Sequence, residues 1–333
     1  MKKIVNLPLV EPVYSTYHNH GNSSAVLFEN PSIRNWLLNE VMILTCEQKF
    51  LNGHTSPEID IEGAAVWKNP YLERVYYPMR HLGGYAHAVI RRLIDDGYYV
   101  LYSEVDDYYM KGKTWYKERH YLHDGLICGY NQLDETYRVY AYDASWIYRA
   151  FDVPKRCFEA GRKAGVRKGV YGLLCGIKAK KDMVDIDLNE ILENLQRYLN
   201  NLPGRIGKRN SDDIHGIVVH DYIITYLNLL LDGRIPYERM DWRVFRLLWE
   251  HKKIMLERIV VIEDLLGFEH EFRECYADIV KTADNMRMLY TAYYLKRRDS
   301  IIANLINKLA LLKTEEEEIL TRLVLKMKEV MEP

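Results

Sequence analysis

The sequence has few of the features that mark secreted, membrane-spanning or metal-stabilised proteins. Its five cysteines are odd in number and scattered, with no CxxC pair, which predicts reduced thiols instead of disulfides or a structural zinc site. No apolar run reaches the ~18 residues that a membrane span requires. The first ten residues lack a signal-peptide core, so a cytoplasmic location is expected.

An excess of charge of one sign is also missing. The 333 residues include 46 Lys plus Arg and 47 Asp plus Glu, a net charge of −1, so neither nucleic acid nor a membrane surface is an expected partner. Gly83-Gly84 is not followed by the Lys-Ser/Thr of a phosphate-binding loop, and no cofactor is predicted. Hydrophobic residues make up 48% and charged residues 28% of the chain, which is an ordinary balance for a globular protein.

The pattern of apolar residues predicts an α+β protein in two parts. In the first part, helices are expected over Ile33–Phe50 and Tyr85–Asp95, and strands over Tyr98–Val105, His120–Gly129, Tyr137–Ala144 and Val170–Ile177. In the second part, helix-period residues fill 188–202, 214–231, 241–266, 269–297 and 299–330. The predicted domains are therefore residues 1–182, with a small antiparallel sheet, and a helical domain or lid over residues 183–333.

Acidic residues cluster near the C-terminus. Thr314 precedes Glu315 to Glu318, and this order is typical of an N-cap followed by acidic residues that complement the helix dipole. The glutamates are therefore expected to form a solvated first turn.

One histidine and one aspartate are placed for acid–base chemistry. If the strands around His123 and Asp143 form a hairpin centred on Leu133, directly opposed residues have numbers that sum to 266, as His123 and Asp143 do. Their Cβ atoms would then lie roughly 5 Å apart, and the carboxylate would orient the imidazole. The alternative is a strand histidine and a surface aspartate with no shared role.

The run from His123 to Asn131, followed by Tyr142-Asp143, resembles the histidine–aspartate segment of papain-like, C39-type peptidases. It is more similar to the family of the N-terminal domain of butirosin biosynthesis protein H and its relatives near nonribosomal-peptide gene clusters. The preceding segment, Ile94 to Val100 with Val105-Asp106 after it, also matches that family. The resemblance implies a papain-like fold, a cysteine nucleophile at the start of the first helix, and transfer of an acyl group from a carrier-protein thioester to an amine.

The sequence departs from that family at the nucleophile. The corresponding segment, Tyr17 to Leu27, contains no cysteine. Ser23 or Ser24 could replace it, with His20 and Asn22 as substrate-binding residues; alternatively, His18 or His20 takes the position and leaves a non-covalent site. Cys46 is the only cysteine before His123, but its place within the predicted helix 33–50 favours a buried core residue.

Other polar clusters receive structural interpretations. His18 and His20 on a strand would point to one side and could bind a metal with His120, His123 or Asp124, but no ligand spacing supports this, and no metal is predicted. Asp106-Asp107, like Asp95-Asp96, are interpreted as turn and strand-end carboxylates.

The sequence therefore predicts an acyltransferase or amide-forming enzyme that acts on an acyl or peptidyl thioester of a carrier protein, with a small amine or peptide as acceptor, in antibiotic-type biosynthesis. A peptidase or thioesterase would use the same residues with water as acceptor. A papain-like pseudoenzyme that binds a peptide or carrier protein is the alternative outside catalysis, and the missing cysteine favours it.

Overall fold

The computed structural model describes residues 3–65, 69–206 and 212–331. It divides into two compact units. Unit 1 comprises Met1–Ile33 and Asn69–Met183, and unit 2 comprises Arg34–Lys68 and Val184–Pro333. The change from unit 1 to unit 2 after Met183 lies close to the predicted boundary. Residues 34–68, which the sequence assigned to the first domain, instead group with the helical unit.

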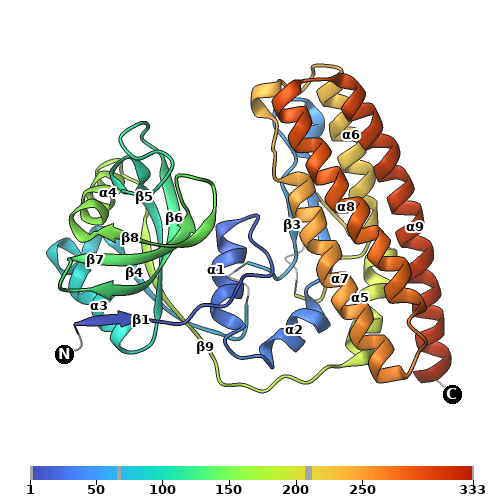
Figure 1. Cartoon of the computed structure of the whole chain (residues 1–333), viewed down its shortest axis with the longest axis horizontal. Coiled ribbons are helices and arrows are strands. Elements are labelled where there is room, and N and C mark those ends of the chain that lie inside the picture. Colours follow the sequence, from blue (N-terminus) through green and yellow to red (C-terminus); the bar gives the residue numbers. More distant parts are fainter. Residues whose placement is uncertain (1–2, 66–68, 207–211, 332–333) are drawn as a thin grey trace. The chain divides into compact units, whose positions relative to one another are not determined.

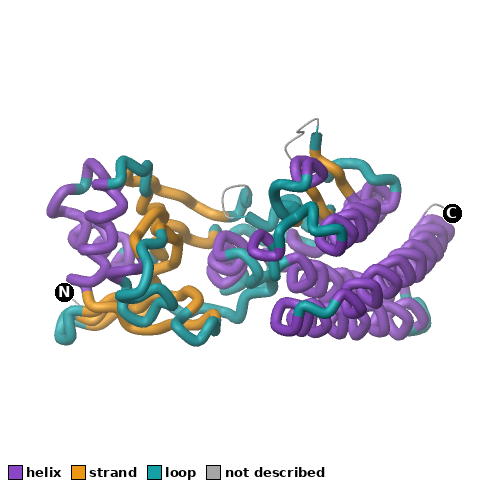
Figure 2. The backbone as a smooth tube through the Cα atoms, turned by 90° about the horizontal axis from the view of Figure 1, so that it is seen from above, coloured by secondary structure: helices purple, strands orange, loops and turns teal. Residues whose placement is uncertain are grey.

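Unit 1 is built on a seven-stranded antiparallel sheet (Figures 1 and 2). The strands follow the order β4-β9-β5-β6-β7-β8, and β1 pairs with β6. Their bounds are β1 Ile4–Asn6, β4 Leu72–Pro78, β5 Tyr99–Asp106, β6 Leu122–Asn131, β7 Thr136–Tyr142, β8 Tyr148–Pro154 and β9 Leu173–Ala179. The helices of the unit are α1 His18–Leu27, α3 Ala86–Asp95 and α4 Lys155–Arg167, and a short 3₁₀ turn, η5, covers Asp107–Tyr109. The predicted helix at 85–95 and the four predicted strands are confirmed.

Helix α4 packs closely against the end of β5 because two glycines face the strand. A Cβ atom on Gly165 would lie 2.0 Å from the carbonyl oxygen of Glu104, and one on Gly161 would lie 2.8 Å from that of Asp106. The register of β5 against β6 shifts between Tyr102 and Val105, and Glu104 has a positive φ of 58°, a conformation that non-glycine residues rarely adopt. Helix α4 therefore packs against the irregular end of β5, which closes with Asp106 and leads directly into η5.

Unit 2 is mainly helical. Its long helices are α5 Leu188–Leu199, α6 Val219–Leu231, α7 Val244–Leu266, α8 Glu271–Lys296 and α9 Asp299–Met331, which confirms the five predicted helical stretches. A three-stranded sheet has the order β10-β2-β3, with β2 Leu44–Glu47, β3 Ile59–Ile61 and β10 Asp213–His215. The class is therefore mixed α and β, with an antiparallel sheet in unit 1 and a helical C-terminal region.

The predicted helix over 33–50 is wrong beyond its first half. Helix α2 covers Ile33–Glu40, and the chain then enters β2 and a 3₁₀ turn, η1, at Gln48–Asn52. Val41 to Leu44 are fully buried. A short, continuous apolar run of this kind does not distinguish a buried strand from a buried helix. Here the segment forms a strand because β2 pairs with both β3 and β10.

A buried ion pair crosses the helices of unit 2. The ammonium group of Lys252 on α7 lies 2.7 and 2.8 Å from the carboxylate oxygens of Glu316 on α9, and both side chains are fully buried. Burial alone would raise the pKa of Glu316, but Lys252, His220 and the Tyr276 hydroxyl lower it on balance, so the carboxylate stays charged. The expected N-cap at Thr314 is wrong, because α9 continues through it and its hydroxyl bonds to the carbonyl of Ala310. Glu316 is not part of a solvated turn.

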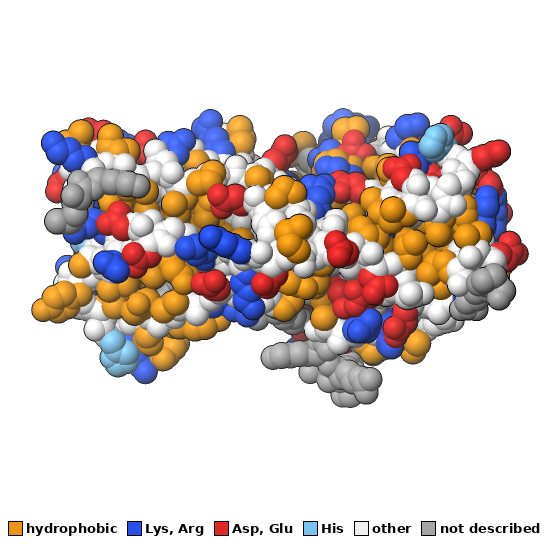
Figure 3. Space-filling model, turned by 90° about the horizontal axis from the view of Figure 1, so that it is seen from below, with side chains coloured by type: hydrophobic (Ala, Val, Ile, Leu, Met, Phe, Trp, Pro, Cys, Tyr) orange, Lys and Arg blue, Asp and Glu red, His pale blue; other side chains and the backbone are white. Residues whose placement is uncertain are grey.

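The surface carries both signs of charge. On the face drawn in Figure 3, acidic and basic side chains alternate with apolar ones in each unit. Across the described residues, no helix is long and apolar enough to cross a membrane.

The pKa of His220 predicts how the stability of unit 2 changes as the pH falls. Burial and the nearby Lys252 lower the pKa of His220 from 6.5 to about 4, so the folded state excludes a proton that the unfolded chain binds below about pH 6.5. The contribution of His220 to the free energy of unfolding is therefore fully present above pH 6.5 and is lost as the pH falls towards 4. Between pH 7 and about pH 5 the loss amounts to about 2 kcal/mol.

Urea unfolding of the wild type and His220→Gln, followed by circular dichroism at both pH values, measures this loss. His220→Gln should show a smaller decrease in the free energy of unfolding on acidification, whereas the exposed His270→Gln should behave as the wild type. An equal decrease in all three proteins would contradict the assignment.

Candidate active site

His123 lies on β6 where this strand pairs with β5. The β6–β7 hairpin forms as predicted, and Leu126 and Ile127 face Tyr140 and Val139 in the register that sums to 266. A bulge at Cys128 shifts the pairing by one residue towards the turn, and the β6–β7 ladder ends at Leu126. On the other edge of β6, His123 pairs with Val105 of β5. Its carboxylate partner comes from the segment that follows β5.

Asp107 is the carboxylate that meets His123. The Nδ1 atom of His123 lies 3.1 Å from Oδ2 of Asp107. Asp107 is the first residue of η5, and its backbone N–H donates to the carbonyl of Tyr121, 2.8 Å away. Only 3% of the Asp107 side chain is exposed, whereas 33% of the His123 side chain is exposed. A buried carboxylate thus orients a histidine whose ring reaches the surface, as in the acid–base half of a catalytic triad.

Asp143, the partner that the sequence predicted, does not pair with His123 among the described residues. Its carboxylate accepts hydrogen bonds from the backbone N–H groups of Ser145 and Ile147 and from Arg149. Although burial raises the pKa of Asp143, these donors lower it on balance. β7 ends at Tyr142, so Asp143 begins a tight turn instead of extending the ladder, and its carboxylate bends back onto that turn.

Asp143 nonetheless supports the site indirectly. Its carbonyl oxygen accepts a hydrogen bond of 3.1 Å from the Thr114 hydroxyl, and the N–H of Ala144 donates to the carbonyl of Gly112. The residue between Gly112 and Thr114 is Lys113, which is part of the site. The turn at Asp143 therefore holds the loop that carries Lys113.

Lys113 supplies a buried positive charge beside the pair. Its ammonium group lies 3.4 Å from Nδ1 of His123 and 3.7 Å from Oδ2 of Asp107, and only 1% of its side chain is exposed. Burial lowers the pKa of Lys113, and the carboxylates of Asp107 and Asp124 oppose that shift. Burial likewise raises the pKa of Asp124, and His123 and Lys113 oppose it. The group combines two carboxylates, one ammonium and one imidazole in a poorly solvated space, where such charges interact strongly.

Tyr102 closes the inner side of this cluster. Burial, followed by the charges of Asp107 and Asp124, raises its pKa well above 10, so its hydroxyl remains protonated. A Cβ on Gly125 would lie 2.3 Å from that hydroxyl, so glycine is needed at this position of β6. Within the described residues, neither the Tyr102 hydroxyl nor Oδ1 of Asp107 has a hydrogen-bond partner.

The His123 ring lies against that of His18, the first residue of α1. The two ring centroids are 4.4 Å apart at an interplanar angle of 33°. The His18 ring also lies 5.3 Å from that of Tyr142 and 5.6 Å from that of Tyr148. Residues 18–27 form a helix, so the strand on which the metal-site alternative for His18 and His20 depended does not form, although the segment is rich in Asn, Ser and Gly, all of which have low helix propensity.

The other residues predicted on α1 are buried. The hydroxyls of Ser23 and Ser24 each donate to the carbonyl of His20 at 2.9 Å, within their own helix. Oδ1 of Asn22 accepts a hydrogen bond of 2.5 Å from Tyr148, and the His20 ring packs against Tyr17 and Tyr14. Asn22 thus supports the tyrosine beside His18, and neither Ser23, His20 nor Asn22 is among the contacts recorded for the His123 ring.

Cys46 does not lie in unit 1. It occupies β2 of unit 2, where it is 1% exposed, and burial raises the pKa of its thiol to about 12. Cys128 and Cys175, on strands of the sheet in unit 1, are buried, and their thiol pKa values are likewise raised. A reactive cysteine requires the opposite shift. The described contacts of His123 are Asp107, Lys113, His18 and Tyr121, none of which has a thiol.

A second histidine–aspartate pair adjoins the first. His120 lies 2.8 Å from Oδ2 of Asp106, which also accepts from Lys168 at 3.1 Å. Burial raises the pKa of Asp106, but these donors and the N–H of Tyr108 lower it on balance. Despite these clusters, no group of three or more His, Cys, Asp or Glu in the described part of the chain is arranged to hold a metal ion.

Sequence reasoning missed Asp107 and Lys113. Asp106-Asp107 was interpreted as a strand-end pair, which is correct for its position, but the strand it ends is the neighbour of the one that carries His123. The position of Asp107 directly after the strand that neighbours β6 is the signal that could have identified it as the partner of His123. Lys113 has no comparable signal, because it lies in a loop. A scan against protein-family models finds no match, and a search of curated proteins finds no significant match.

The geometry predicts that Asp107, and not Asp143, controls the imidazole of His123. Asp107→Asn removes the charge that fixes the Nδ1–H tautomer, so the ¹⁵N chemical shifts of His123 should move by several parts per million. Asp143→Asn should leave those shifts nearly unchanged. Long-range ¹H–¹⁵N spectra of histidine-labelled protein make the comparison, and the reverse pattern would restore the predicted pair.

Proposed function

We propose that unit 1 catalyses acyl transfer from a thioester to an amine by general acid–base catalysis, with His123 as the base and Asp107 as its orienting carboxylate. The observation that carries the proposal is the 3.1 Å contact between Nδ1 of His123 and buried Asp107. This contact occupies Nδ1 and leaves Nε2 as the nitrogen that exchanges protons with a substrate.

The reaction needs no covalent enzyme intermediate. Nε2 of His123 removes a proton from the attacking amine while the nitrogen bonds to the thioester carbonyl carbon. The tetrahedral adduct then breaks its C–S bond, and the imidazolium returns the proton to the leaving thiolate, so an amide and a thiol are formed. The Asp107 carboxylate stabilises the imidazolium between these steps.

The acyl donor belongs to the same proposal. The resemblance of the His123 segment to a family that acts on carrier-bound acyl or peptidyl groups supports a carrier-protein thioester as donor and a small amine or peptide as acceptor. Water as acceptor would make the same residues a thioesterase or peptidase.

The assay uses N-acetylcysteamine thioesters of acetyl, octanoyl and phenylacetyl groups with glycine ethyl ester or butylamine as acceptor. His123→Ala should lower the rate of amide formation by at least about a hundredfold, the usual scale for loss of a general base. Asp107→Asn should also reduce the rate strongly, whereas Ser23→Ala, Cys46→Ala and iodoacetamide treatment should not.

Mass spectrometry of the intact protein during turnover distinguishes the mechanisms. Amide product without a protein adduct supports direct aminolysis. An acylated residue would show that a nucleophile exists, and the peptide that carries the acyl group would identify it. Wild-type rates in folded His123→Ala would remove His123 from the mechanism.

A binding role is the second candidate, and His18 is the observation that favours it. In the resembled family the cysteine nucleophile begins the first helix, and here His18 is the first residue of α1, with its ring 4.4 Å from that of His123. A papain-like unit with this replacement would hold a peptide or carrier protein without reacting. This candidate predicts that the assay above yields neither amide product nor a protein adduct, while calorimetric titration shows saturable binding of the thioester.

Substitution of His18 tests the papain-like arrangement itself. In His18→Cys the new thiol stands at the N-terminus of α1 beside His123, where helix N–H groups and an imidazolium stabilise a thiolate. It should react with iodoacetamide at pH 7 at least about tenfold faster than a free thiol, because a lowered pKa increases the thiolate fraction. His18→Cys/His123→Ala should lose this acceleration. Equal labelling rates in the two variants would show that His123 does not activate this position.

A further inference from the structure

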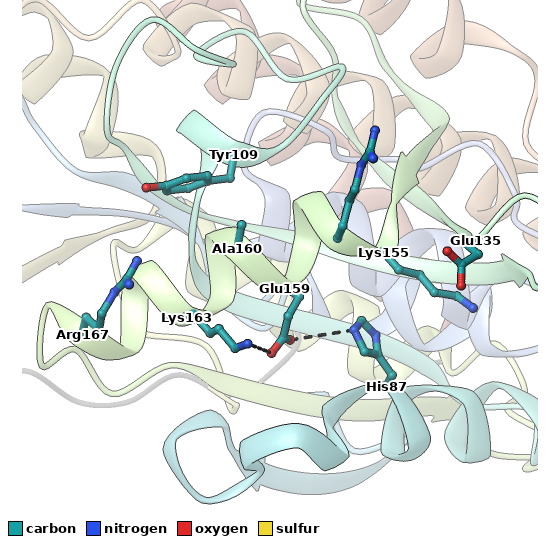
Figure 4. A pocket seen from close by; sticks show the side chains of 9 residues that line it. His87, Tyr109, Glu135, Lys155, Glu159, Ala160, Lys163 and Arg167 are labelled. Carbon is teal, nitrogen blue, oxygen red and sulfur yellow. Dashed lines mark ion pairs between the residues drawn. The ribbon is translucent and has the colours of Figure 1, made fainter.

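A separate pocket lies along the exposed side of α4. Its volume is about 530 Å³, within the range of small-molecule sites. Six of its lining residues lie along α4, and they are joined by His87 of α3, Tyr109 of η5 and Glu135 of the β6–β7 turn (Figure 4). None of the lining residues contacts His123, so this pocket is distinct from the candidate active site.

The pocket has an excess of positive charge. Lys155, Arg156, Lys163 and Arg167 line it, against the two carboxylates of Glu135 and Glu159. Glu159 is already engaged, because it accepts two hydrogen bonds from buried Arg162 and lies 3.3 Å from Lys163. Among the described residues, Lys155, Arg156 and Arg167 have no carboxylate within ion-pair distance.

The cations are distributed along the helix. Arg156, Lys163 and Arg167 are separated by seven and four positions, which places them along one side of α4. Eleven residues of helix span about 16 Å. Figure 4 shows Arg167 at one end of the pocket and Lys155 with Glu135 at the other, with Lys163 between them. Ala160 lies midway and leaves the space that longer side chains would fill.

His87 forms part of the wall without adding a charge. Its Nδ1 lies 2.5 Å from the Tyr137 hydroxyl, and its Nε2 lies 4.0 Å from Glu159. Burial lowers the pKa of His87, and the Glu159 charge only partly opposes this shift. The cations facing the pocket are therefore the four basic side chains.

We propose that this pocket binds a small molecule that carries two or more linked phosphate groups. An extended anion matches cations spread over the length of α4 better than a single phosphate does. Guanidinium groups bind phosphate through paired, charge-assisted hydrogen bonds, and in the part of the chain that the structure describes no carboxylate lies within ion-pair distance of Arg156 or Arg167. The concave wall formed with His87, Tyr109 and Glu135 distinguishes the site from a solvated basic face.

Calorimetric titration of the full-length protein with inorganic phosphate, pyrophosphate, tripolyphosphate and citrate tests the proposal. Saturable binding should strengthen from phosphate to tripolyphosphate. Arg156→Ala/Arg167→Ala should weaken tripolyphosphate binding by at least about tenfold, since each lost charge-assisted contact is substantial. The control Arg92→Ala/Lys181→Ala removes the same net charge from exposed positions of unit 1 and should change the affinity less than about twofold.

Three results would overturn the proposal. The first is the absence of saturable binding of tripolyphosphate to the wild-type protein. The second is equal weakening by the two double variants, which would mean that only net charge matters. The third is binding of citrate as tight as that of tripolyphosphate, which would show that linked phosphates are not selected. Thermal unfolding of every variant confirms that it is folded before titration.

Discussion

The burial of the Asp107 carboxylate is the constraint on which the candidate site depends. A carboxylate that is 3% exposed is costly unless opposite charge or hydrogen bonds compensate for the lost hydration. Lys113 and His123 supply that compensation. The loop that carries Lys113 must therefore fold back over the end of β5, and the turn at Asp143 holds it there. The buried charge of Asp107 thus accounts for the positions of the Lys113 loop and of the His123 side chain.

Unit 2 also contains a buried carboxylate whose lost hydration is compensated by nearby polar groups, but there the surrounding network is closed to solvent. Glu316 is fully buried and is surrounded by Lys252, Tyr276, Tyr198 and His220. Every one of these partners is itself buried, so the network is closed to solvent, and it joins α9 to α5, α6, α7 and α8. Around Asp107 the network is open on one side, because a third of the His123 side chain is exposed. This opening is the physical difference between a structural polar cluster and one that can exchange protons with a ligand.

The serine hydroxyls and thiols that the sequence offered as nucleophiles are engaged or buried in the structure. The hydroxyls of Ser23 and Ser24 are used within α1, and burial raises the thiol pKa of the strand cysteines. A histidine occupies the start of α1 instead. A histidine that meets a buried carboxylate and, among the described residues, has no thiol in contact with it is suited to activating a substrate's own nucleophile, and this supports the direct aminolysis proposed above.

The long helices of unit 2, most strands of unit 1 and the β6–β7 hairpin could be predicted from the amino-acid sequence, because apolar periodicity and turn residues act over a few neighbouring positions. The sequence also singled out His123 as a candidate, and the catalytic role of this residue stays a prediction. Tertiary structure decided the rest. The β6–β7 ladder ends at Leu126, short of His123, and the irregularity after Tyr102 pairs His123 with Val105 of β5, so its partner is Asp107 and not Asp143. Packing against Tyr148 and the sheet made α1 a helix, and pairing with β3 and β10 made Leu44–Glu47 a strand. Burial of Lys113 and Glu316 likewise depends on residues distant in the chain, and no local pattern encodes such a contact.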